Sequence, residues 1–259
     1  MKKSIIYSTL FTVAILVHAS ILAEPIVHKV PSFEKIIVSP HIRLVLEPGD
    51  EESVLITETK VEESKINVKV VGRTLRIYLD KAKDYTKHKK NRDYESKYGS
   101  NKRPMYLGTL VTAKVTYKDL KKMSIRGEED VECLGLIKSK KFKLKVFGEA
   151  DVNIASIESQ QLKTALYGEN KIKFHDGRIS DHKIKAYGDN NVDLSKLVST
   201  RTRTTSFGVS NLNLNAKDKV KITAFGESEF NVTGGAKVYR GIVIGENRIY
   251  EYIPKSTQI

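Results

Sequence analysis

The stretch KVFGEADVNI, residues 145–154, decides the fold. It places an aromatic residue before a glycine and an acidic residue after it, and then alternates apolar with polar residues. Two later stretches, ALYGENKIKF at 165–174 and KAYGDNNVDL at 185–194, repeat this order. Self-similarity at a fixed period of this length indicates a repeat architecture, in which each unit packs on its neighbours.

Anchoring on glycine reveals seven copies of the unit, 18 to 21 residues apart. Apolar residues four and six positions after the glycine alternate with polar ones, which is the period of a β-strand. Glycine suits a corner between two strands because it lacks a Cβ and accepts positive φ. The corner glycines are Gly127, Gly148, Gly168, Gly188, Gly208, Gly226 and Gly245.

A single unit cannot bury its apolar face, whereas stacked units share a continuous core. We therefore predict an all-β fold, a right-handed parallel β-helix (a β-solenoid) of about seven coils of 18–21 residues, preceded by a strand-rich N-terminal lobe. The rival fold is an antiparallel sandwich, which seldom keeps so regular a period over seven copies. No long segment after the N-terminal apolar run shows the period of a helix.

The predicted organisation has three parts. Residues 1–23 read as a signal peptide, residues 24–122 as the N-terminal β lobe, and residues 123–259 as the β-helix repeats, with the lobe and repeats forming one continuous domain. Within the lobe, the sequence predicts a turn at residues 48–50 and a hairpin that turns near Gly72.

The N-terminus predicts export. Lys2 and Lys3 precede an apolar run over residues 5–17 and then small residues, the layout of a signal peptide cleaved after Ala23 or Ala19. The alternative is an uncleaved anchor helix, but the apolar run is short for a helix that spans a membrane. We therefore expect cleavage, and no stable transmembrane span after it. The protein would then lie in the periplasm or at the cell surface.

The chain is basic, with a formal net charge of +14, and much of that charge is local. Residues 81–103 carry nine Lys or Arg against three Asp or Glu, and no Leu, Ile or Val. This pattern predicts a long solvated loop, either an anion-binding arm or a solubilising insertion. For an exported protein, anionic polysaccharide, lipopolysaccharide or a membrane surface is a better partner than nucleic acid. The arm's candidate residues are Lys87, Lys89, Lys90 and Arg92.

The opening FEKIIVSPHIRLVLEPGDEESVLIT at 33–57, INVKVVGRTLRIYL at 66–79 and the glycine repeats together resemble the DUF2807 family. This family is described as an autotransporter adhesin head, or GIN, domain that is common in Bacteroidetes. The resemblance covers about residues 33–252 and implies an exported β-helix with no established catalytic residues. The chain departs from the family in its aromatic residue before the glycine and in its long basic loop.

The aromatic departure supplies the first candidate site. Alternation sends the residue before the glycine outward, so a stripe of rings could stack on sugar rings or meet a partner protein. The alternative is that the corner breaks alternation and turns these rings into the core. The aromatic residues are Phe147, Tyr167, Tyr187, Phe207 and Phe225.

Acidic residues follow the same glycines and would form an adjacent column. Like charges one strand spacing apart repel, so the column needs solvation, lysine partners such as Lys145 and Lys185, or bridging cations. Solvation is the simplest reading, because a calcium site needs six or more oxygen ligands. We expect no metal site here. The candidate ligand-binding acids are Glu149, Glu169, Asp189 and Glu227, flanked by Glu128 and Glu246 and interrupted by Val209.

Other chemistry-bearing residues give weaker signals. His175, Asp176, Asp181 and His182 are close in sequence, but Asp176-Gly177 is a turn signal and we predict ordinary loop residues. Cys133 occupies an inward position and should be buried; as the only cysteine it precludes an intrachain disulfide. No nucleophile elbow, phosphate loop or zinc cluster is found, and we expect no cofactor.

Two classes of function fit these patterns. The first is a noncatalytic exported binding or adhesion module that contacts a glycan or a cell-surface or envelope component. The second is a polysaccharide-active β-helix enzyme, a lyase or hydrolase, which would need acids that converge in a groove. A regular corner column of acids favours the first.

Overall fold

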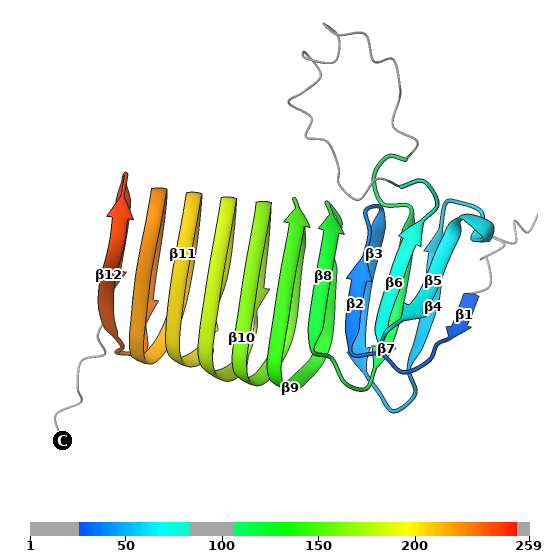
Figure 1. The fold of residues 1–259 in the computed structure, drawn as a ribbon, viewed down its shortest axis with the longest axis horizontal. Coiled ribbons are helices and arrows are strands. Elements are labelled where there is room, and N and C mark those ends of the chain that lie inside the picture. The colour runs from blue at the N-terminus through cyan, green and yellow to red at the C-terminus, as the bar shows by residue number, and fades with distance from the viewer. Residues whose placement is uncertain (1–25, 83–105, 253–259) are drawn as a thin grey trace, which may run out of the picture.

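The structure is a computed structural model that describes residues 26–82 and 106–252. Its described residues are almost entirely β-strand, with one short 3-10 helix, η1, at Glu63–Lys65. Figure 1 shows the strands stacked side by side along the long axis of the molecule. The predicted all-β fold is confirmed.

The glycine repeats form a parallel solenoid. Its strands are β8 (Lys122–Gly127), β9 (Val131–Gly148), β10 (Asp151–Phe174), β11 (Gly177–Thr233), β12 (Lys237–Ile244) and β13 (Asn247–Glu251). Gly168 pairs with Gly148 on one side and with Gly188 on the other, in parallel register. The sandwich alternative is therefore wrong. The solenoid has about 6 turns, because seven corners enclose six intervals.

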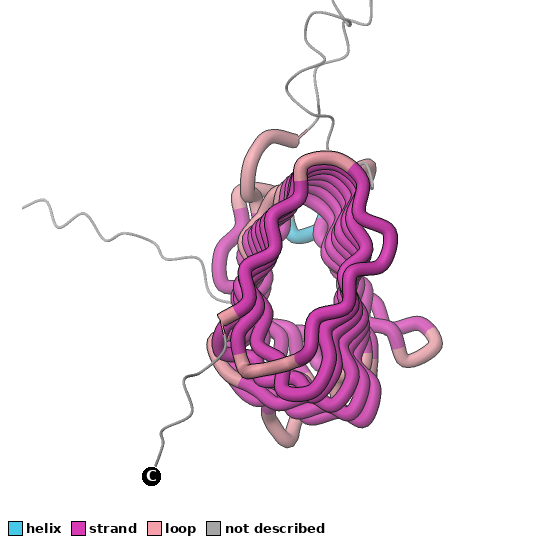
Figure 2. The backbone as a smooth tube through the Cα atoms, turned by 90° about the vertical axis from the view of Figure 1, so that its left-hand side faces the viewer, coloured by secondary structure: helices cyan, strands magenta, loops and turns pink. Residues whose placement is uncertain are grey.

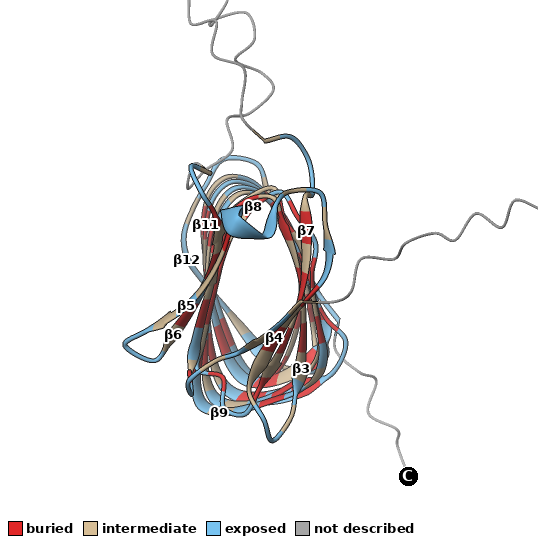
Figure 3. Cartoon of the chain, turned by 90° about the vertical axis from the view of Figure 1, so that its right-hand side faces the viewer, coloured by how far each residue is buried: buried red, intermediate tan, exposed pale blue. Residues whose placement is uncertain are grey.

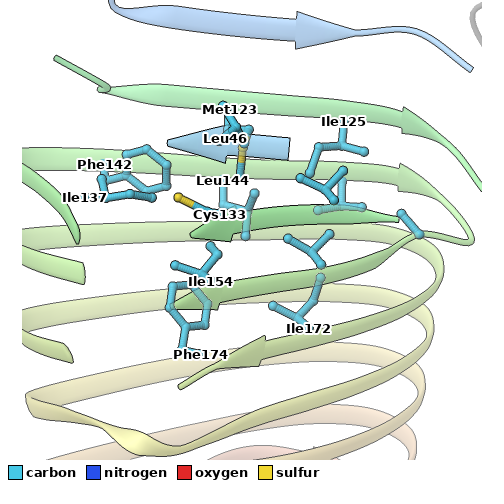
Figure 4. Close-up of a cluster of buried hydrophobic side chains, with 14 of the residues drawn as sticks. Leu46, Met123, Ile125, Cys133, Ile137, Phe142, Leu144, Ile154, Ile172 and Phe174 are labelled. Atoms are coloured by element: carbon cyan, nitrogen blue, oxygen red, sulfur yellow. The ribbon is translucent and has the colours of Figure 1, made fainter. Parts of the chain in front are cut away.

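Alternation along each coil builds the core. The residue two positions before the glycine and those four and six positions after it point inward and are buried through most of the stack. Figure 4 shows Cys133, Ile154 and Phe174 from successive coils, together with Leu144, packed inside the solenoid. Viewed end-on in Figure 2, the coils overlay as one elongated ring. Each coil buries its apolar face against the coils on both sides of it.

The N-terminal strands continue this stack. They are β1 (Ile26–Lys29), β2 (Lys35–Val38), β3 (Ile42–Pro48), β4 (Ser53–Thr59), β5 (Ile66–Val71), β6 (Thr74–Leu79) and β7 (Val111–Tyr117). β2 pairs with β8 and β3 with β9, both in parallel. β6 and β7 pair in turn with β2 and β3, also in parallel. The pairs β2–β3 and β6–β7 thus repeat the strand–corner–strand pattern outside the regular glycine series.

Antiparallel strands complete the N-terminal end. β5 and β6 form the predicted hairpin, whose two turn residues Gly72 and Arg73 have φ of 54° and 58°. β4 pairs with β7 and β1 with β4. Viewed from this end, Figure 3 shows buried residues along the walls of the solenoid and exposed residues at its turns. The boundary between lobe and repeats at residue 122 stays a prediction. Lys122 begins β8, and the pairing of β8 with β2 joins the lobe to the repeats.

The predicted signal peptide, residues 1–23, lies outside the described residues. Among residues 26–82 and 106–252, no helix is long and apolar enough to cross a membrane.

Candidate functional site

A glycine at positive φ holds each corner of the repeats. Gly168 and Gly188 have φ of 110° and 101°. A Cβ on Gly188 would lie 2.5 Å from the carbonyl oxygen of Gly168 in the preceding coil. Because only glycine permits this approach, the residues on either side of the corners fall into straight columns along the solenoid axis.

The residues before five of these glycines form the aromatic column. Tyr167 and Phe207 are exposed by 37% and 38%. Phe147, Tyr187 and Phe225 are half-buried. The residue immediately before each ring in the sequence, such as Leu166 or Ala186, is fully buried. The rings therefore lie on the outer face of the sheet.

The five rings stack continuously along the axis. Centroids of neighbouring rings are 4.9, 5.1, 5.1 and 4.7 Å apart, and their planes differ by at most 5°. A guest ring between two of them would need about 7 Å, twice the van der Waals contact distance. No ligand ring can therefore intercalate, and the column presents one continuous ridge. The guanidinium of Arg126 lies 5.9 Å from the Phe147 centroid and closes one end.

The acidic column follows the glycines as expected. Glu169, Asp189 and Glu227 are exposed, and Glu149 is half-buried. Glu169, Asp189 and Glu227 form no ion pair with any residue that the structure describes. These three carboxylates are therefore solvated rather than held by Lys145 or Lys185, and they remain open to a ligand's hydroxyl groups.

A buried polar ladder lies one position further on and was not predicted. The Asn170 side chain accepts a hydrogen bond from the Ala150 backbone N–H at 3.3 Å and donates one to Asn190 Oδ1 at 3.1 Å. Both asparagines are 1% exposed. The sequence signal was a polar residue two positions after the glycine in consecutive copies. These amides link neighbouring coils by hydrogen bonds at the corners, and they are inaccessible to a ligand.

The other candidate residues are dispersed. His182 is buried and lies 2.9 Å from the Thr164 hydroxyl, and burial lowers its pKa to about 3. His175 and Asp176 are exposed, while Asp181 forms a bidentate pair with Arg201 at 2.8 and 3.0 Å. Within the described chain, no three His, Cys, Asp or Glu residues gather as a metal site would require.

Cys133 is buried, as predicted. Its Sγ lies 3.5 Å from the Tyr117 hydroxyl, and burial raises the pKa of both groups. A cavity of about 330 Å³ nearby is lined by Glu132, Asn153 and His175 among others. Arg43 binds the Glu132 carboxylate at 2.7 Å. This carboxylate is therefore already occupied by an ion pair within the protein.

The candidate anion-binding residues Lys87, Lys89, Lys90 and Arg92 lie outside the described residues. The strands that bracket their segment, β6 and β7, flank a corner in line with the glycine corners. Next to this corner, His41 Nδ1 lies 2.8 Å from the Gly108 carbonyl oxygen, and the His41 and Tyr106 rings are 5.8 Å apart. The described chain on either side of this segment therefore lies at the edge of the solenoid that carries the corner glycines, the upper edge in Figure 1.

A direct test of this segment is to replace Lys87, Lys89, Lys90 and Arg92 together with glutamine. If the segment contacts anions, the variant should elute from heparin at lower salt, with a flatter dependence of retention on ionic strength, because fewer charges are screened. Thermal unfolding should be unchanged, since the segment lies outside the predicted core. Unaltered elution would leave it a solubilising insertion.

A column of cations on the same outer face was also missed. The residue five positions before the glycine is basic in all seven copies, although Arg240 in the last copy pairs with Ile222 and so falls out of register. Lys35 extends the column at the other end because it pairs with Lys122. We call these residues the basic column: Lys35, Lys122, Lys143, Lys163, Lys183, Arg203 and Lys221. The signal is present in the sequence as a basic residue at a constant distance before the corner glycines.

Comparison with known families identifies one match. The profile described as "Putative auto-transporter adhesin, head GIN domain" (DUF2807) matches residues 32–236. None of the curated proteins compared with the chain matches it.

Solved structures share the fold at low sequence identity. A protein from Bacteroides fragilis, named a putative adhesin, superposes with a TM-score of 0.72 at 19% identity, covering 88% of this chain and 96% of that one. One from Parabacteroides distasonis, named a putative lipid binding protein, gives 0.62 at 16% identity with the same coverage. A putative adhesin from Parabacteroides merdae gives 0.57 at 15% identity, covering 88% and 95%. At these identities, the likeness establishes the fold alone.

Proposed function

Because the chain belongs to the DUF2807 (head GIN domain) family, we propose that it is an exported, noncatalytic, adhesin-like protein that binds a glycan or another cell-surface or envelope component. Its compartment would be the periplasm or the cell surface, as the N-terminal residues 1–23 predict. The adhesin-like role agrees with the description of the family.

The observation that carries the proposal is the aromatic column. Five parallel rings about 5 Å apart form a partly exposed ridge about 20 Å long on the outer face of the sheet. A contiguous apolar surface of this kind marks an interaction site more often than chance exposure. The solvated carboxylates of Glu169, Asp189 and Glu227 lie beside it and can accept hydrogen bonds from hydroxyl groups. Together they suit the mixed apolar and polar surface of a sugar chain laid along the ridge.

The alternative, a polysaccharide lyase or hydrolase, has less support. A glycosidase needs two carboxyl groups facing each other across the scissile bond. The acids that follow the corner glycines lie in single file on one side of the ridge, at a spacing set by the coils. Their geometry suits display rather than catalysis.

The proposal is tested by replacing Tyr167 and Tyr187 together with alanine. These adjacent rings stack at 5.1 Å, so the double variant interrupts the centre of the ridge. We expect binding to the best responding glycan of an array, measured at low and moderate salt, to weaken at least tenfold. The free energy of unfolding should fall by about 1.5–4.5 kcal/mol, since three stacked pairs are lost and each contributes about 0.5–1.5 kcal/mol.

The matched control replaces Tyr239 and Tyr250, which are exposed by 39% and 43% on the last coil and lie outside the ridge. Glycan binding by this control should be unchanged. If both double variants bind alike, the ridge is not the contact surface.

A further inference from the structure

The basic column runs the length of the solenoid as a file of single charges. Lys143, Lys163 and Lys183 pair directly in parallel register, so their backbones are one strand spacing apart, about 4.8 Å. Lys35, Lys122 and Lys143 extend the file toward the N-terminus by the same pairing. All seven members except half-buried Lys122 are exposed.

The cations of the basic column lack acidic ion-pair partners among the described residues. None of Lys143, Lys163, Lys183, Arg203 and Lys221 forms an ion pair with a described residue. The residue two positions nearer the glycine adds Lys145 and Lys185 on the same face. The carboxylate of Asp181, two positions further from the glycine, is already bound by Arg201. The face therefore has a continuous excess of positive charge.

This arrangement is costly for the isolated protein. Two like charges one strand spacing apart repel even in water, and the repulsion recurs between each pair of neighbours. Directly opposed like charges destabilise a sheet, and lysine is a poor strand former. The pKa of Lys122 is lowered, first by partial burial and then by Lys145, Lys143, Lys35 and Arg126. A bound polyanion would relieve this repulsion.

The same outer face ends in a cationic cavity at the N-terminal side. The cavity is about 370 Å³ and is lined by Lys69, Arg76, Arg126, Tyr78 and Ser39 among others, with no acidic residue. Lys69 and Arg76 are directly opposed across the hairpin, another like-charge pair. Its volume lies in the range of small-molecule sites, and one sugar unit would fit.

We propose that the basic column binds an extended anionic polysaccharide, which lies along the solenoid axis with its carboxylate or sulfate groups facing successive coils. The proposal rests on the proposed function, since it names the chemical class of the glycan. It assigns charge recognition to the basic column and leaves apolar contact to the aromatic column. These columns are four residues apart on each strand, about 13 Å, so one polymer or two parallel chains can engage both.

Other polyanions fit the face less well. Proteins that bind single-stranded nucleic acid stack its bases on aromatic faces, but rings about 5 Å apart leave no room for a base between them. A lipid surface extends in two dimensions and has no repeat along one direction, so it would not favour a single file of cations. A polymer that carries one charge per unit along a line matches the single file of cations.

The test neutralises the centre of the column with Lys163→Gln, Lys183→Gln and Arg203→Gln in one variant. Binding to heparin and to polygalacturonate, measured by biolayer interferometry over a range of salt concentrations, should weaken at least tenfold. The slope of affinity against salt should also fall, because fewer counterions are displaced. The melting temperature should be equal or higher, since repulsion is removed.

The matched control is Lys171→Gln, Arg178→Gln and Lys196→Gln, which removes the same charge from exposed positions of nearby coils outside the column. Its affinity should stay within about threefold of the wild type, since long-range charge is screened. Equal losses in both variants would mean that only net charge matters and would overturn the proposal. Tighter binding of the wild type to single-stranded DNA or to phosphatidylglycerol vesicles than to the polysaccharides would overturn it as well.

The two proposals fail separately. If the basic-column variant binds both anionic polysaccharides normally while Tyr167→Ala/Tyr187→Ala loses glycan binding, the proposed function stands and the anionic class is wrong. If the basic-column variant loses binding and the tyrosine variant does not, the polysaccharide is held by charge and the aromatic ridge is not its site.

Discussion

Gly188→Ala is expected to destabilise the protein by about 3–5 kcal/mol. Alanine at φ of 101° is strained by about 1–3 kcal/mol. Its Cβ would in addition lie 2.5 Å from the Gly168 carbonyl oxygen, a backbone atom held within the parallel stack. Since neither coil can move without breaking neighbouring pairs, the overlap adds to the strain. Thermal denaturation followed by circular dichroism should show a melting temperature lower by about 10 °C.

Gly72→Ala is the control for this substitution. Gly72 also has positive φ, 54°, but no atom lies within 4 Å of its added Cβ. The cost there should be about 1–2 kcal/mol, the strain of a left-handed residue alone. A Gly188→Ala variant no less stable than Gly72→Ala would show that the corners are not as closely packed as described.

Acidification should destabilise the protein through His182. The folded-state pKa of this buried side chain is lowered to about 3 from the ordinary value of 6.5. Between these values the unfolded chain binds a proton that the folded chain does not, so the stability contributed by neutral His182 is complete above pH 6.5 and is lost as pH falls toward 3. Each pH unit costs about 1.4 kcal/mol, or roughly 3 kcal/mol by pH 4.5.

Comparison with His182→Gln isolates this effect, because glutamine can still bond to Thr164 and does not titrate. Urea unfolding at pH 7.5 and 4.5 should show that the wild type loses about 3 kcal/mol more than this variant. His175→Gln, at an exposed position, should follow the wild type. Parallel pH profiles for all three proteins would mean that water reaches His182 in the folded state.

The sequence predicted the repeats because two periods coincide in them. Alternation identified the strands, and the spacing of glycines such as Gly148 and Gly168 identified the coils. The first coils were not recognised because they do not keep the glycine spacing: His41, with φ of 73°, lies at the first corner. At the next, β6 ends at Leu79 and β7 begins only at Val111. Pairing between β2 and β8 is a long-range fact that no local pattern reveals.

The candidate surfaces were predicted only in part. Alternation gave the outward direction of Tyr167 and its equivalents, but not the ring spacing of about 5 Å, which depends on how the coils stack. At that spacing the rings contact one another and form a continuous ridge, so a sugar ring cannot stack between two of them. The buried amides of Asn170 and Asn190 were not predicted, since nothing in the sequence distinguishes an amide that faces solvent from one bonded to the next coil.

Register between coils has a consequence for how this family can change over generations. Since Gly148, Gly168 and Gly188 pair in line, a duplication of one 20-residue unit would insert a layer without disturbing the others. Such an event would add one ring, one carboxylate and one cation, each already in place. Each duplicated unit would therefore lengthen the surface available to a polymer by one coil.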